Sequence, residues 1–277
     1  MTTRAERPQP SPLRNLPILY EDASCLAVAK PAGMAVHGGA GEDAVNVIDL
    51  LRSAGRERER EHTHERKRRA GAGAGTVDAP RSDPSWSDLH LVHRLDKGTS
   101  GVLLLAKSAR VARELTSGWS DAIKEYLALS AGSLTQRTTV RAQLGRRDGR
   151  QQDAQTEVEP LGELPAFNPM STLLCARIST GRHHQIRRHL AELGCPILMD
   201  RQHGDFAANR EWAESVRAAI GVKPKHPMLH ALRLTIPRGR AGNQRLDIRA
   251  PCPEAWIRIL EAGGGSDALM QSVRGSA

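Results

Sequence analysis

Short strand-like segments follow one another along most of this chain, with few helical patterns between them. Alternating or continuously apolar residues bounded by turn residues predict strands at Ile18–Tyr20, Cys25–Ala29, Val102–Lys107, Lys124–Leu129, Val140–Leu144, Ala154–Glu159, Ser171–Ser179, Met228–Ile236 and Leu246–Ala250. Strands that succeed one another without intervening helices argue against a doubly wound sheet. The order therefore predicts an α+β fold with a mainly antiparallel central sheet.

Helical patterns are fewer. Apolar residues at helical spacing predict helices at Ala44–Leu51, Ala109–Ser117, Ala207–Ile220 and Pro253–Leu260. A further helix is predicted from His184, because Ile186, Leu190 and Leu193 fall at i, i+4 and i+7 and Gly194 is placed to end it. We expect these helices to flank the sheet.

The charge balance and the cysteines restrict the partner and the compartment. Lys and Arg number 40 against 31 acidic residues in 277, and the net charge of +9 favours a polyanionic partner. The four cysteines lack C-x-x-C spacing, so neither a zinc site nor a disulfide framework is indicated. No apolar run approaches the roughly 18 residues of a membrane span. We expect a cytoplasmic, monomeric protein that has no membrane segment.

Composition changes abruptly between residues 53 and 87. Arg56 to Arg69 alternates bases and acids before it becomes purely basic, and Gly71 to Gly75 alternates glycine with alanine. Almost nothing there can be buried, which predicts a disordered or partly helical insertion. The alternative is a flexible arm that tracks RNA phosphates. Residues 1–15 and 263–277 are predicted to be tails, which leaves 16–262 as one domain.

A charged cluster precedes one of the predicted strands. The residues His93-Arg94-Leu95-Asp96-Lys97-Gly98-Thr99-Ser100-Gly101 run directly into the apolar segment Val102–Ala106. If the approach is extended, Arg94 and Asp96 project to the same side, and Gly98 and Gly101 permit a tight turn after the acid. This position favours an active site, although a solvent-exposed, salt-bridged turn has the same pattern.

A second polar stretch begins the helix predicted from His184. It reads Gly181-Arg182-His183-His184-Gln185-Ile186-Arg187-Arg188-His189-Leu190. His184 and His189 are five residues apart and cannot share a helical face as i, i+4 metal ligands do. No carboxylate or cysteine lies beside them at ligand spacing, so we expect no metal site. Arg187 lies off the apolar stripe, near the start of the helix.

Both stretches resemble signatures of the RluA-type RNA pseudouridine synthases. Residues 93–101 match every fixed position of the family's HRLD-x-x-TSG motif, and residues 181–189 match G-R-x-H-Q-I-R-x-H, with His183 where threonine is common. Further matches are Tyr20-Glu21-Asp22 through Lys30-Pro31-Ala32-Gly33 to His37, the K-x-Y-x-A pattern at Lys124, Tyr126 and Ala128, and Leu229-His230-Ala231. Cys195 to Asp205 resembles another family segment, with Cys195, Met199 and His203 as departures. The pair Gly38-Gly39 looks most like the RluC subgroup.

The resemblance implies the pseudouridine synthase catalytic fold, with a central RNA-binding cleft in which uridine becomes pseudouridine without a cofactor or metal. Asp96 would be the catalytic carboxylate, through attack on the sugar, abstraction of a sugar proton or addition to the pyrimidine. Arg187 would pair with it and Tyr126 would stack on the target base. Arg94 would enter the space that the base leaves, and Leu229 would pack beside the base.

Five other motif residues are expected at the RNA-binding site: Lys30, His93, Thr99, Arg182 and His184. Alternatives remain open for some residues. Lys30 is either an RNA-facing base or a loop charge, and His37 either contacts substrate or makes a loop hydrogen bond. Without the resemblance, Tyr126 would be read as a core residue.

The expected partner is RNA. The RluC-like pair at Gly38-Gly39 leans toward large-subunit ribosomal RNA, with transfer RNA as the alternative. Only Met1 to Leu19 precede the first motif, so we expect substrate selection without an N-terminal S4 domain. A non-catalytic RNA-binding protein and a hydrolase that releases free uracil are rival functions.

Overall fold

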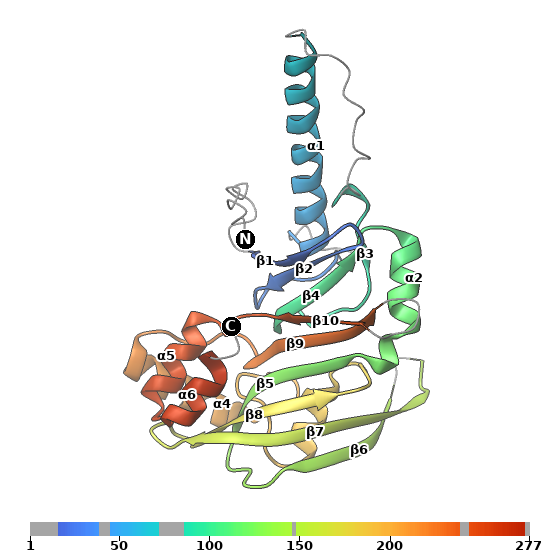
Figure 1. The fold of residues 1–277 in the computed structure, drawn as a ribbon. Helices are drawn as coiled ribbons and strands as arrows, with labels where there is room; N and C mark the ends of the chain where they lie inside the picture. The colour runs from blue at the N-terminus through green and yellow to red at the C-terminus, as the bar shows by residue number, and fades with distance from the viewer. Residues whose placement is uncertain (1–15, 39–44, 72–85, 146–147, 239–243, 275–277) are drawn as a thin grey trace.

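The computed structural model describes residues 16–38, 45–71, 86–145, 148–238 and 244–274. One mixed sheet runs through this part of the chain, in the order β1-β2-β4-β9-β5-β8-β7-β6, with β3 paired to β4 and β10 paired to β9 (Figure 1). Its pairs are antiparallel except for β4 and β9, which are parallel. The predicted α+β class and mainly antiparallel sheet are confirmed.

The strands are β1 (Ile18–Glu21), β2 (Cys25–Lys30), β3 (His90–Leu91), β4 (Ser100–Ala106), β5 (Ile123–Ala131), β6 (Thr138–Gly145), β7 (Gln151–Leu164), β8 (Ser171–Ile178), β9 (Leu229–Arg238) and β10 (Gln244–Arg249). The α-helices are α1 (Val47–Gly71), α2 (Ala109–Ser117), α3 (Gln185–Glu192), α4 (Phe206–Ile220), α5 (Glu254–Ala262) and α6 (Asp267–Arg274). Short 3-10 turns lie at Trp86–Asp88 and Trp119–Asp121.

Two large apolar cores lie on either side of the β4–β9 junction. One joins β5, β7 and β8 to helices α3 to α6, and the other joins β2 and β4 to the start of α1. At the junction Gly101 (φ +113°) lies beside Ala231, whose carbonyl oxygen would be 2.1 Å from an added Cβ. Only glycine fits that backbone and that approach. This close contact fixes the turn before β4 against the start of β9.

Helix α1 is much longer than the predicted helix Ala44–Leu51. Its first turns bury Val47, Ile48, Leu51 and Ala54, and arginine and glutamate, which favour helix, continue it to Gly71. The predicted insertion is therefore helical up to residue 71. Residues 72–85 lie outside the described residues.

The prediction of a C-terminal tail at residues 263–277 is wrong for residues 267–274. They form α6, which buries Leu269, Met270 and Val273 in the core beside α5. Their i, i+1 and i+4 spacing makes a helical stripe too short to stand out in the sequence. The predicted tail at 1–15 and residues 275–277 lie outside the described part. Among the described helices, none is both long and apolar enough to cross a membrane.

Candidate active site

The turn that carries Asp96 is fastened to the loop after β2. The amide of Gly33 donates to the carbonyl of Lys97 (2.8 Å), and Thr99 closes the turn by donating from its amide to the carbonyl of Asp96 (3.0 Å). The Asp96 side chain keeps 27% of its surface exposed. Its carboxylate is thus held at a fixed place while it remains open to a ligand.

Arg187 joins Asp96 to a second carboxylate. Its Nη1 donates to Asp96 Oδ2 (3.1 Å), while Nε and Nη2 donate to the two oxygens of Asp200 (2.6 and 2.7 Å). Burial opposes the charge on Arg187, but the two carboxylates outweigh it and raise its pKa. The structure therefore brings Asp96 and Arg187 together, as expected, and adds Asp200 behind them.

Sequence reasoning missed the part played by Asp200. This side chain is fully buried and also accepts hydrogen bonds from the amides of Gln202 (2.9 Å) and His203 (3.2 Å). Burial disfavours its charge, yet Arg187 and the two amides lower its pKa. The preceding Met199 has φ +64°, a strained angle for a residue with a side chain, in a position where the family has glycine. The resemblance of Cys195–Asp205 to a family segment was the available signal.

Three histidines in mutual contact adjoin this ion pair through His184. His184 lies 3.6 Å from Asp96 Oδ2 through Nε2 and shares a hydrogen bond with His203 through Nδ1 (3.0 Å). The ring of His183 stacks on that of His184 at 3.7 Å. Burial lowers the pKa of His184 to about 4, although Asp96 opposes the shift. His184 is consequently neutral near pH 7 and borders Asp96 without adding charge.

Tyr126 and Leu229 lie on the neighbouring strands β5 and β9. Tyr126 pairs with Ala231 across the two strands, beside a register shift, and it packs against both apolar cores. Burial, with a smaller contribution from Asp96, raises the pKa of the Tyr126 hydroxyl. Leu229 is buried at the start of β9. Tyr126 is therefore a partly buried residue that packs against both cores and lies near enough to Asp96 to feel its charge.

Lys30 is not the RNA-facing base that one reading of the sequence allowed. Its side chain is 1% exposed, and Nζ donates to the carbonyls of Pro31 (2.9 Å), Met34 (2.8 Å) and Lys97 (3.2 Å). Burial lowers its pKa to about 7, against the pull of Asp96. Lys30 thus fastens the loop after β2 to the turn that carries Asp96.

Four other residues that were expected to contact RNA differ in their surroundings. His93 accepts from the amide of Leu104 (3.0 Å) and stacks on Trp119, so its ring supports β4 and does not join the Asp96 cluster. Thr99 is buried, and Arg182 Nε donates to the carbonyl of Asp153 (3.2 Å). Arg94, two residues before Asp96 in the chain, is exposed.

His37 donates from Nδ1 to the carbonyl of Gly38 (3.0 Å), the loop hydrogen bond that was one of its two interpretations. Gly39 lies outside the described residues. Within the described part of the chain, no group of three or more His, Cys, Asp and Glu side chains is arranged to hold a metal ion.

Comparison with known proteins agrees with this geometry. The family model described as RNA pseudouridylate synthase matches residues 24–192. The human RNA pseudouridylate synthase domain containing 4 shares the fold, with a TM-score of 0.64, 22% identity and coverage of 89% of this chain and 92% of that chain.

Bacterial relatives match most of the chain. The tRNA pseudouridine synthase C of Salmonella typhi is 29% identical over 94% of both chains. The ribosomal large subunit pseudouridine synthase C of Salmonella typhimurium is 34% identical, over 88% of this chain and 69% of the relative. The ribosomal large subunit pseudouridine synthase D of Xanthomonas campestris is 31% identical, over 92% and 70%.

Fold and family match together define an isomerase that converts uridine in RNA to pseudouridine. The chain belongs to the RluA-type RNA pseudouridine synthase family.

Proposed function

We propose that Asp96 drives the isomerisation, with Arg187 as its partner. The observation that supports this assignment is the asymmetric fork of Arg187, which binds buried Asp200 through two nitrogens and offers a third to the partly exposed Asp96. Guanidinium groups held this way orient a carboxylate and offset its charge. Asp96 is thereby aimed at a ligand while its own position is fixed.

The reaction exchanges one bond of the uridine for another. The bond from N1 to C1′ breaks, the uracil turns, C5 bonds to C1′, and the proton on C5 is lost while N1 gains one. Asp96 can begin this by attacking C1′, by abstracting a sugar proton or by adding to the pyrimidine. Each route uses the carboxylate of Asp96, which Arg187 orients through its Nη1.

The target base must leave its helix to reach Asp96, at a cost of a few kcal/mol. We assign the exposed Arg94 to the space that the base vacates. Tyr126 and Leu229, on adjacent strands, would hold the extruded uracil by stacking and apolar contact. His184 borders the carboxylate, whereas Lys30, His93, Thr99 and Arg182 shape the surrounding turns.

For the substrate, we propose transfer RNA. This rests on the match to the tRNA pseudouridine synthase C, which extends over 94% of this chain, against 92% and 88% for the large-subunit enzymes. The second candidate is large-subunit ribosomal RNA, because the large-subunit enzyme of Salmonella typhimurium is 34% identical to this chain, against 29% for the tRNA enzyme.

Purified protein incubated separately with transfer RNA and large-subunit ribosomal RNA, both lacking modifications, distinguishes these candidates. We expect pseudouridine at discrete positions of transfer RNA and no free uracil. Modification confined to ribosomal RNA would contradict the proposed substrate but leave the reaction intact. Release of uracil would indicate a hydrolase, and binding of RNA without product would indicate a non-catalytic protein.

A further inference from the structure

Helix α1 extends away from the body of the protein, while its base is firmly fixed (Figure 1). Arg52 donates to the carbonyl of Leu89 (2.9 Å), and Arg58 lies 4.3 Å from the centre of the Trp86 ring and 3.7 Å from Glu21. At about 1.5 Å per residue, the helix is about 37 Å long. From Glu59 onward, every described side chain of α1 is exposed. The outer half therefore projects from the body of the protein with its side chains in solvent.

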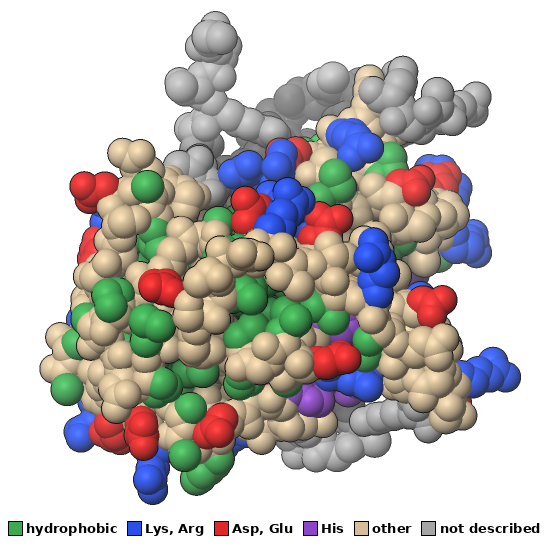
Figure 2. All heavy atoms as spheres, turned by 90° about the horizontal axis from the view of Figure 1, so that it is seen from below, with side chains coloured by type: hydrophobic (Ala, Val, Ile, Leu, Met, Phe, Trp, Pro, Cys, Tyr) green, Lys and Arg blue, Asp and Glu red, His purple; other side chains and the backbone are tan. Residues whose placement is uncertain are grey.

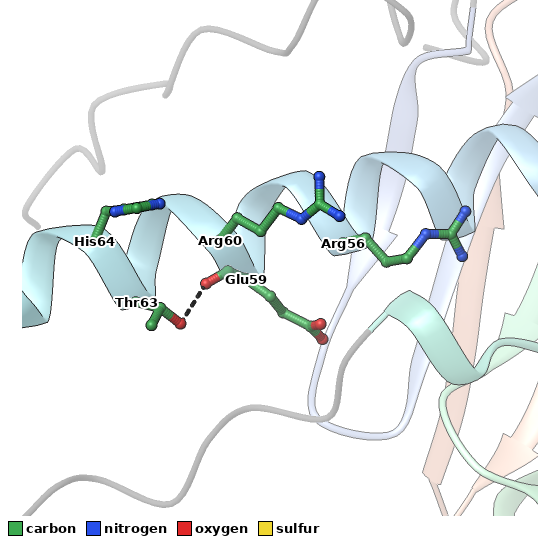
Figure 3. A pocket seen from close by; sticks show the side chains of 5 residues that line it. All are labelled: Arg56, Glu59, Arg60, Thr63 and His64. Atoms are coloured by element: carbon green, nitrogen blue, oxygen red, sulfur yellow. Dashed lines mark hydrogen bonds between the residues drawn. The ribbon is translucent and has the colours of Figure 1, made fainter.

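Several basic side chains of this projection share one row along the helix. Arg56, Arg60, His64 and Arg68 succeed one another at intervals of four and form one stripe of exposed side chains, here called the arginine stripe. Figure 3 shows the first three following one another along the helix, with Glu59 and Thr63 beside them around a shallow hollow. Glu57 and Glu61 occupy a different row.

Within each row, charges of the same sign follow one another at one turn of the helix. Opposite charges at i, i+4 stabilise a helix by about 0.2–0.5 kcal/mol per pair, and like charges destabilise it by similar amounts. The pair Arg56 and Arg60 is of the second kind, as is the pair Glu57 and Glu61. Opposite charges at i, i+3, as in Glu57 and Arg60, offset part of this cost. Among the described residues, Arg56, Arg60 and Arg68 make no ion pair. By contrast, acidic and basic side chains are interspersed on the face seen in Figure 2.

We propose that the arginine stripe binds the phosphodiester backbone of the substrate RNA, outside the active site. A row of arginines without carboxylate partners is complementary to a row of phosphates. The inference rests on the proposed function, because it takes the RNA to be the substrate.

The base of the helix is coupled to the turn that carries Asp96. The amides of Val47 and Ile48 donate to the carbonyls of Ala35 (3.0 Å) and Val36 (3.1 Å). The same loop, through Gly33 and Lys30, is bonded to the carbonyl of Lys97. Two steps of hydrogen bonding thus separate α1 from the catalytic turn. The loop after β2 therefore fixes both the base of α1 and the turn that carries Asp96. RNA bound at Asp96 would lie at a fixed place relative to the arginine stripe.

The test removes the charge of the stripe and keeps its helix. In the variant R56Q/R60Q/R68Q, glutamine retains high helix propensity. We expect the slope of log affinity against log salt to become shallower by about 2–3, and affinity near 0.1 M salt to fall by on the order of 100-fold. KM should rise while kcat at saturating RNA stays unchanged, because none of the three arginines contacts the Asp96 cluster.

Two matched variants control for net charge and for folding. R113Q/R245Q/R249Q removes three exposed arginines from α2 and β10 and should leave the salt slope near that of wild type. R56K/R60K/R68K keeps the charge and should retain most of the affinity. Circular dichroism checks that helicity is preserved in all three.

An equal loss of affinity in R56Q/R60Q/R68Q and the α2/β10 variant would show a net-charge effect and overturn the proposal, as would no loss in either. These outcomes are separate from failure of the proposed function. If wild type binds RNA through the stripe but makes no pseudouridine, only the proposed function fails. If all variants make product with equal kcat/KM, only the stripe fails.

Discussion

Replacement of Asp200 by asparagine removes the charge that holds Arg187 without changing the size of the side chain. Asp200 is fully buried and accepts four hydrogen bonds, two from Arg187 and two from backbone amides. Removal of one partner of a buried ion pair costs about 3–5 kcal/mol, because the remaining charge is left poorly compensated. Arg187 keeps its bond to Asp96, so we expect a loss near the lower limit, about 3 kcal/mol.

The same substitution should impair catalysis at temperatures where the variant is folded. Freed from Asp200, the guanidinium can turn fully toward Asp96 and shift the carboxylate. A displacement of about 1 Å in a catalytic group can lower the rate by about 100-fold. We therefore expect kcat to fall by about this factor while RNA affinity is retained, as measured by single-turnover kinetics and filter binding.

Asp247 provides a matched control on the surface. It receives a fork of the same geometry from Arg233, with both nitrogen-to-oxygen distances 2.7 Å, but the two side chains are 41% and 31% exposed. Exposed pairs contribute about 0–1 kcal/mol. Urea unfolding should therefore show a much smaller loss for Asp247→Asn than for Asp200→Asn. Equal losses, or an unchanged kcat in Asp200→Asn, would refute the role of Asp200.

The pH dependence of stability gives a further check on the same residue. Because the pKa of Asp200 is lowered in the folded protein, its ion pair stabilises the fold above the ordinary carboxyl pKa of about 3.9. That contribution is lost as the pH falls toward the folded pKa. Between pH 5 and 3, wild type should lose more stability than Asp200→Asn.

Three further predictions concern Tyr126, Lys30 and Leu269. Tyr126→Leu keeps an apolar side chain but loses stacking worth about 1–3 kcal/mol, so kcat/KM should fall by roughly 5- to 150-fold; an unchanged value would exclude a base-stacking role. Lys30 has a pKa lowered to about 7, so wild type should gain stability as the pH rises from 7 to 9, where the unfolded chain binds more protons. Urea midpoints of Lys30→Met should lack that rise, and its RNA salt slope should equal that of wild type. Leu269→Ala should cost about 2–5 kcal/mol in urea unfolding, against no loss if α6 were a detached tail.

The sequence predicted those features that depend on pattern over many residues. The order of the strands defined the α+β class, and the apolar stripe Ile186, Leu190 and Leu193 predicted α3. The motifs also predicted that Asp96 and Arg187 would meet across 91 residues of chain, which the structure bears out at 3.1 Å. That success came from the family resemblance, since spacing alone left Asp96 in an ordinary charged turn.

Features that depend on the direction of a single side chain were not predictable. Nothing in the residues around Lys30 shows that its amine turns inward to three carbonyls, and nothing around His93 shows that its ring supports β4. Asp200 lies in a segment that departs from the family at Met199 and His203, and its bond to Arg187 depends on how α3 packs. The length of α1 was missed because a charged sequence has no apolar stripe to reveal a helix.

The role of Asp96 can be tested most directly with RNA that carries tritium at C5 of uridine. Formation of the bond from C5 to C1′ expels that hydrogen, so wild type should release tritium and produce pseudouridine. Asp96→Asn should bind the same RNA with wild-type affinity and release none. Tritium release by Asp96→Asn at a rate near that of wild type would contradict the assignment of Asp96 as the catalytic carboxylate.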